Sequence, residues 1–217
     1  MGFVSALLLA IAMTVIQMGN IYTRGITFKN VNQAGGSIAS ELQRSIANSS
    51  YFNVTPNGPL YVKNVQSGRL CTGQYSYVWN YGKYIKTPGL NYIKYASDNS
   101  VIYFAKIHDS SLSVCTKNIL SGVYPDINKF DAVELLGSGQ FDLAIHNFII
   151  RTNSSATDLA TNQALYTIEF ILGTNETTAL QYDANGIPIC RLAGDIQADT
   201  LYCALNRFDI VARAGKG

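Results

Sequence analysis

The N-terminal segment of this chain carries no charged side chain, and this feature restricts the fold more than any other. Residues 1–23 contain no Asp, Glu, Lys or Arg, and residues 3–18 read FVSALLLAIAMTVIQM with only isolated polar side chains. A helix over residues 3–22 would be about 30 Å long at about 1.5 Å per residue, which matches the hydrocarbon thickness of a bilayer. The sequence therefore predicts one membrane-spanning helix at the N-terminus.

A cleaved secretory signal and a buried core helix are the two alternatives to a membrane helix for this segment. A cleaved secretory signal has basic residues before its apolar run and small residues at its cleavage site, but nothing basic precedes Phe3 and no convincing A-x-A cleavage site follows the apolar run. A buried core helix of a small protein is rarely apolar on every side. A retained membrane helix agrees best with the sequence, and it places the rest of the chain on one side of the bilayer.

An amphipathic helix is predicted to follow directly. Apolar residues recur every three or four positions at Val31, Ala34, Ile38, Leu42 and Ile46. Glycine inside a helix costs about 1 kcal/mol relative to alanine, so we expect the long helix to bend or loosen at its glycines. These are Gly19, Gly25, Gly35 and Gly36. The helix is expected to end near residue 50, so residues 1–50 form the helical part of the chain.

Residues 51–217 are predicted to form a β-rich globular head. Apolar and polar residues alternate there, and Tyr, Val, Ile and Phe are frequent, which is typical of strands. The expected strands are 60–65, 75–81, 101–107, 112–116, 141–150, 165–172, 178–182, 187–192 and 208–213. Residues 183–186 favour a hairpin turn, and the polar residues 153–162 favour an exposed loop. The predicted fold class is α+β, with a long N-terminal helix packed on an antiparallel β-sheet head.

This arrangement resembles a known family. Gly2 and Phe3 open a charge-free apolar helix, an amphipathic helix follows, and a cysteine-bearing antiparallel head completes the chain. The order resembles that of the type IV pilins and pseudopilins of bacteria. The resemblance implies a pilin-like fold, cleavage by a prepilin peptidase after Gly2, and N-methylation of the new first residue, Phe3. Because no basic leader precedes Gly2, Met1 is the alternative first residue of the mature chain.

The chain also departs from the pattern of that family. Pilins usually carry Glu at the fifth mature position, which here is Leu7 when counted from Phe3 and Ser5 when counted from Met1. No acidic residue occurs before Glu41, and the helix-breaking proline that is common in the family is missing. The N-terminus is therefore more similar to divergent or minor pilins than to the best-known major ones.

The resemblance implies a function as a structural subunit of an extracellular type IV pilus-like filament at the cell surface, with adhesion, motility or DNA uptake as its role. The subunit would lie in the inner membrane before assembly. Its partners would be copies of itself in a helical homopolymer or other pilins, and the pilus assembly machinery. The side chains expected in the filament core are Phe3, Val4, Leu7, Leu8, Leu9, Ile11, Val15 and Ile16. The alternatives are a monomeric membrane-anchored adhesin or binding domain, and a minor pilin at a filament tip.

The chain has four cysteines, Cys71, Cys115, Cys190 and Cys203. Their spacing lacks the short Cys or His pairs that a structural zinc site uses, so no metal is expected. Disulfides are favoured in a head that lies outside the cell. Of the three possible connectivities, we predict Cys71 with Cys115 and Cys190 with Cys203. A disulfide-bounded segment near the C-terminus also resembles that of many pilins.

No catalytic signature is present in the sequence. The patterns G-x-S-x-G, H-E-x-x-H, G-x-x-x-x-G-K-[ST] and G-x-G-x-x-G are all missing. His108 lies beside Asp109, but sequence neighbours on a strand point apart and rarely form an acid-base pair. We therefore expect no enzymatic activity and no cofactor.

One group of aromatic and basic residues is a candidate ligand patch. Tyr75, Tyr77, Trp79 and Tyr81 alternate along a predicted strand, so all four would share one face, with Lys83 and Lys86 close by. Aromatic rings beside amines can bind single-stranded nucleic acid, and aromatic platforms also bind glycans. The competing interpretation, which we favour, is that this face packs on the long helix as core.

Overall fold

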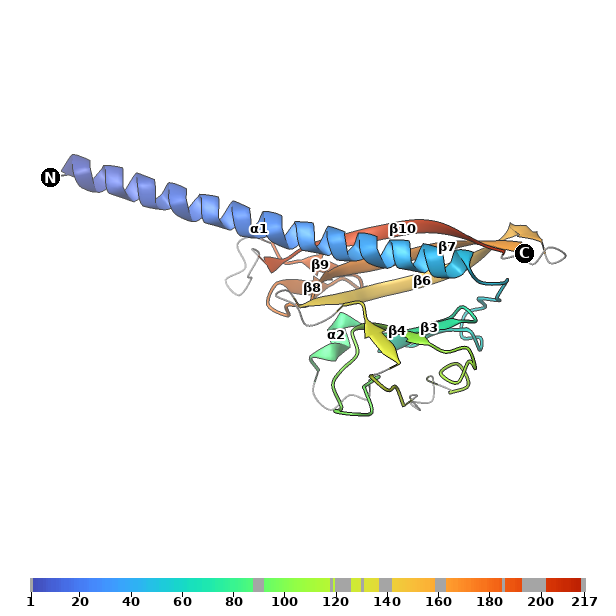
Figure 1. Ribbon diagram of the computed structural model, residues 1–217. Helices are drawn as coiled ribbons and strands as arrows, with labels where there is room; N and C mark the ends of the chain where they lie inside the picture. Colours follow the sequence, from blue (N-terminus) through green and yellow to red (C-terminus); the bar gives the residue numbers. More distant parts are fainter. Residues whose placement is uncertain are drawn as a thin grey trace.

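The computed structural model describes residues 2–87, 92–117, 119, 126–129, 131–136, 142–158, 163–184, 186–192 and 202–215. A single helix, α1 (Gly2–Ala47), begins the chain. Its N-terminal half projects away from the rest of the molecule, and its C-terminal half lies along the sheets of the head (Figure 1). Met1, the alternative first residue of the mature chain, lies outside the described residues. The long N-terminal helix and the antiparallel sheets together establish an α+β fold.

The C-terminal half of α1 is amphipathic, as its sequence predicts. Val31, Ile38, Leu42 and Ile46 are fully or almost fully buried and belong to the core. The glycines do not interrupt the helix, because α1 is continuous through all four of them. Gly35 contacts the ring of Phe208, while Gly19, Gly25 and Gly36 face open space.

A five-stranded antiparallel sheet forms one layer of the head. Its strands follow one another along the chain and across the sheet, and α2 (Gly82–Ile85) comes directly after the third. The strands are β1 (Tyr61–Lys63), β2 (Ser67–Cys71), β3 (Tyr75–Asn80), β4 (Phe104–His108) and β5 (Ala132–Glu134). The strand predicted at residues 112–116 is a turn instead.

A second antiparallel sheet contains the longest strands, in the order β10-β7-β6. These are β6 (Leu143–Asp158), β7 (Gln163–Thr174) and β10 (Leu205–Ala214). The exposed loop predicted at residues 153–162 is wrong in its first part, because β6 continues to Asp158 and pairs there with Gln163. A small hairpin, β8 (Leu180–Tyr182) and β9 (Pro188–Cys190), turns at the predicted position, and Gly186 has a φ of 75°.

One hydrophobic core joins the helix to both larger sheets. The ring of Trp79 on β3 lies 4.4 Å from that of Phe148 on β6, and Phe170 on β7 stacks on Phe208 of β10 at 5.0 Å. At the far end of α1, the amide of Gly215 donates to the carbonyl of Ser49. The second half of α1 is therefore part of the head, and only the first half stands free of it.

Candidate functional site

The projecting half of α1 is the most unusual surface of the molecule. Its most apolar window has a mean hydropathy of 1.9 and contains no buried residue, so the helix is long and apolar enough to span a membrane. All the side chains predicted for the filament core are exposed on it. They are Phe3, Val4, Leu7, Leu8, Leu9, Ile11, Val15 and Ile16. A continuous apolar surface of this size needs lipid or protein around it.

Two threonines on this segment are hydrogen-bonded within the helix. The hydroxyl of Thr14 donates to the carbonyl of Ala10 at 2.8 Å, and that of Thr23 donates to the carbonyl of Gly19 at 3.0 Å. Such bonds satisfy a hydroxyl where no water is available. These two hydroxyls can therefore lie in an apolar environment without an unpaired donor.

The first acidic residue of the chain, Glu41, is bonded to side chains of the head. Oε1 of Glu41 accepts a hydrogen bond from the ammonium group of Lys106 on β4 at 2.5 Å, and a weaker one from the hydroxyl of Tyr77 at 3.3 Å. Glu41 also lies about 50 Å further along the helix than position 5. Within one subunit, Glu41 therefore cannot neutralise the terminal amine.

Both predicted disulfides are present. Cys71, at the end of β2, is bonded to Cys115 in the turn after β4, and Cys190, at the end of β9, is bonded to Cys203 just before β10. The first links a strand of the five-stranded sheet to the loop beside it. The second ties the small hairpin to the strand that packs on α1.

The aromatic face of β3 points into the core. Tyr77 and Trp79 are fully buried and Tyr81 is 5% exposed, because this face packs against α1 and β6. Tyr75 is half-buried, with the ammonium group of Lys106 at 3.7 Å from its ring centroid. The ligand patch is therefore wrong as an open stacking platform, and the competing interpretation of a core face is confirmed.

The two lysines of that predicted patch have different surroundings. Lys86 forms an ion pair with Asp142 at 2.8 Å, so its charge is already neutralised. Lys83 and the ring of Tyr81 line a separate cleft of about 380 Å³, together with side chains from β1, β6 and the β8–β9 hairpin. The sequence gives no sign of this cleft, because its residues come from segments that are far apart in the chain.

Among the residues that the structure describes, no three His, Cys, Asp or Glu side chains are grouped as ligands of a metal ion. The two histidines lie apart: His108 is exposed at the end of β4, and His146 is buried in β6. Comparison with protein-family models, with curated proteins and with solved structures finds no match to this chain.

Proposed function

We propose that this protein is a structural subunit of an extracellular type IV pilus-like filament, assembled through the projecting half of α1. The observation that carries the proposal is the continuity of α1: one half is apolar and fully exposed, while the other is built into the core of the head. Such a subunit can lie in a membrane by its first half before assembly. In a filament the same half packs against the helices of neighbouring subunits, and the heads cover the outside.

The energetics of the projecting half favour assembly over a free, water-soluble chain. Each large apolar side chain left in water rather than buried costs about 1.5–3 kcal/mol, so leaving the whole segment in water would cost on the order of 10 kcal/mol or more. Transfer from lipid to protein gains nothing from this term, since both surroundings are apolar. The gain there comes from close van der Waals packing between helices.

The head has properties that suit the outside of a filament. Two disulfides are stable in an oxidising compartment. The second half of α1 is held by core packing and by the Glu41–Lys106 ion pair, so the projecting half is carried on a rigid base. Processing at Gly2, with Phe3 as the methylated first residue, belongs to the same proposal.

Electron microscopy tests this function directly. Material sheared from the surface of producing cells should contain thin filaments that bind gold-labelled antibody against the head. A variant with Ile11→Lys should abolish the filaments, whereas Val133→Lys, the matched change at an exposed apolar position of the head, should leave them intact. Membrane fractionation of Ile11→Lys shows whether the variant still inserts.

A different result of the same experiment would reject the filament proposal. If the chain stays in the membrane fraction of wild-type cells and the filaments do not bind the antibody, the subunit proposal is rejected. A monomeric membrane-anchored adhesin or binding domain then becomes the better description.

A further inference from the structure

The cleft that Lys83 and Tyr81 line lies at the edge of the β6-β7-β10 sheet. Strand β6 is the edge strand there, and the cleft is bounded by β1, α2 and the turn of the β8–β9 hairpin. Its volume of about 380 Å³ falls in the range of small-molecule sites, near the lower end. A site of this size takes a small ligand or one unit of a larger one.

A β-bulge places His146 in this cleft. Ile145 pairs with Leu172 and Asn147 pairs with Ile171, so His146 is an extra residue in β6. Bulges of this kind redirect a side chain and are frequent beside binding sites. The ring is buried, and it lies 6.4 Å from that of Tyr182 on the hairpin.

His146 has an unsatisfied acceptor. Burial lowers the pKa of its imidazole to about 4, so the ring is neutral at pH 7. Nε2 lies 3.1 Å from the carbonyl oxygen of Thr174 and must carry the proton, because a carbonyl only accepts. Nδ1 is then a buried lone pair, and no donor reaches it from the part of the chain that the structure describes. A ligand hydroxyl is one group that can supply the missing donor.

The described lining of the cleft carries positive charge. Lys63 and Lys83 line it and no described Asp or Glu does, although Glu169 on β7 acts on Lys63 from outside the cleft. The ammonium group of Lys63 donates to the neutral amide oxygen of Asn147 at 2.7 Å. The ammonium group of Lys83 lies 5.2 Å from the ring centroid of Tyr182 and 5.7 Å from that of Tyr84.

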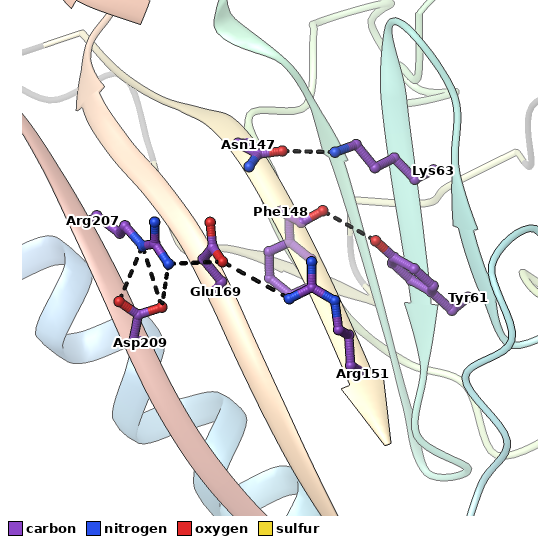
Figure 2. A network of polar contacts seen from close by, with 8 residues as sticks. All are labelled: Tyr61, Lys63, Asn147, Phe148, Arg151, Glu169, Arg207 and Asp209. Carbon is purple, nitrogen blue, oxygen red and sulfur yellow. Dashed lines mark hydrogen bonds and ion pairs between the residues drawn. The ribbon is translucent and has the colours of Figure 1, made fainter. Parts of the chain in front are cut away.

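The carboxylates on the neighbouring sheet surface are already paired. Glu169 on β7 accepts from Arg207 at 3.0 Å and lies 4.0 Å from Arg151, and Asp209 pairs with the same Arg207 at 3.1 Å. Figure 2 shows this chain of ion pairs on one side and the hydrogen bond from Lys63 to Asn147 on the other. The arrangement leaves the lysines of the cleft available for an anion from outside.

We propose that this cleft binds an acidic sugar, with its carboxylate held by Lys63 and Lys83, its ring against the tyrosine faces, and a hydroxyl donating to His146. Each part of this ligand answers a feature of the cleft: an anion for the unpaired ammonium groups, a ring for the aromatic walls, and a donor for the buried lone pair. The site lies wholly in the head, so it does not depend on whether the chain polymerises.

Titration calorimetry on the full chain in neutral detergent micelles tests the proposal with glucuronate as the probe. We expect saturable binding of glucuronate, at least tenfold weaker binding of uncharged glucose, and a loss of affinity as salt is raised. Lys83→Gln should weaken glucuronate binding at least tenfold. Lys94→Gln is the matched control, because Lys94 is likewise an exposed lysine over a tyrosine ring, 4.9 Å from the centroid of Tyr92, and lies outside the cleft.

Three results would overturn the inference. The first is no binding of glucuronate by the wild-type chain, and the second is equal binding by Lys83→Gln and wild type. The third is tight binding of glucose 6-phosphate without binding of glucuronate, which would assign the anion as phosphate. Circular dichroism confirms that each variant is folded, and the ¹⁵N shift of Nδ1 in His146 reports whether the ligand donates to it.

Discussion

The ring of Phe208 on β10 lies directly against the backbone of Gly35 in α1, in the space that a Cβ atom at that position would occupy. Phe208 is also stacked on Phe170, so it has little room to move away. We predict that Gly35→Ala lowers the free energy of unfolding by about 1–3 kcal/mol, because forced overpacking outweighs the gain in helix propensity. Chemical denaturation in detergent measures the change.

The neighbouring glycine is a matched control for this prediction. A Cβ at Gly36 meets nothing within 4 Å. Gly36→Ala should therefore raise the free energy of unfolding by up to about 1 kcal/mol, through helix propensity alone. Equal effects of the two substitutions would show that the contact with Phe208 does not fix the position of the helix on the head.

The ion pair between Glu41 and Lys106 is the second link between helix and head. Both side chains are about one-fifth exposed, so removal of one charge leaves the other partly desolvated. We predict that Glu41→Gln lowers the free energy of unfolding by about 1–2 kcal/mol. A double-mutant cycle with Lys106→Gln should return a favourable coupling energy.

The pair between Lys129 and Asp98 serves as the comparison. Its side chains are about half exposed, at 49% and 45%. Lys129→Gln should leave stability nearly unchanged, because water and salt screen an exposed pair. A coupling of similar size in the two pairs would argue against the anchoring role of Glu41.

Patterns that repeat along one element were sufficient to predict much of this fold. The spacing of Val31, Ile38, Leu42 and Ile46 gave the buried face of α1, and alternation gave most strands. The connectivity of the cysteines was also predicted correctly. Each of these features depends on local periodicity or, for the cysteines, on a choice among only three possible pairings.

Features that depend on contacts between distant elements could not be predicted. Around His146 an apolar run is interrupted by two adjacent polar residues, His146 and Asn147, and this pattern alone does not identify a bulge. The glycines of α1 were expected to weaken the helix, yet Gly35 makes room for Phe208, which is far away in sequence. The core position of the face formed by Tyr77 and Trp79 was favoured from the sequence, but its cover by Phe148 of β6 was not predicted.

His146 should make stability depend on pH. In the unfolded chain a histidine binds its proton near pH 6.5, but the buried ring binds it only near pH 4, because burial disfavours the charged form. The stability that the neutral ring contributes is therefore fully present above about pH 6.5, is lost as the pH falls, and reaches a loss of about 3 kcal/mol near pH 4.

Unfolding experiments on the wild type and on His146→Gln check this sign. The variant should be less stable at pH 7, but its free energy of unfolding should fall less steeply between pH 6.5 and pH 4. Identical slopes in the two proteins would mean that the ring takes up its proton as readily in the folded state as in the unfolded one.

Removal of either disulfide should reduce stability, and the loss should grow with the logarithm of the length of the loop that the disulfide closes. Cys190 and Cys203 are 13 residues apart, and Cys71 and Cys115 are 44 apart. From the entropy of loop closure, replacing Cys190 and Cys203 by serine should lower the free energy of unfolding by about 3 kcal/mol. Replacing Cys71 and Cys115 should lower it by about 4 kcal/mol. Thermal unfolding of both double variants measures the loss, and peptide mapping without reductant should recover each pair in the wild type.

The missing glutamate near the N-terminus leads to the last prediction. In pilins this carboxylate is thought to neutralise the terminal amine of a neighbouring subunit inside the apolar core of the filament, where an unpaired charge costs several kcal/mol. Here position 5 is Ser and position 7 is Leu, and Glu41 is engaged by Lys106. In the proposed filament the amine would therefore stay hydrated, lose its proton, or pair with another type of subunit.

We expect a homopolymer, because the packing of a long apolar helix can offset one poorly solvated amine. Ser5→Glu and Leu7→Glu should then lower the yield of sheared filaments or leave it unchanged, since each adds a charge to an apolar core. Ser5→Gln and Leu7→Gln are the matched controls, with nearly the same shape and no charge. A large increase in yield from either glutamate, but not from its glutamine partner, would show that the filament retains a place for the carboxylate. In that case this chain would depend on a partner subunit that carries the acid.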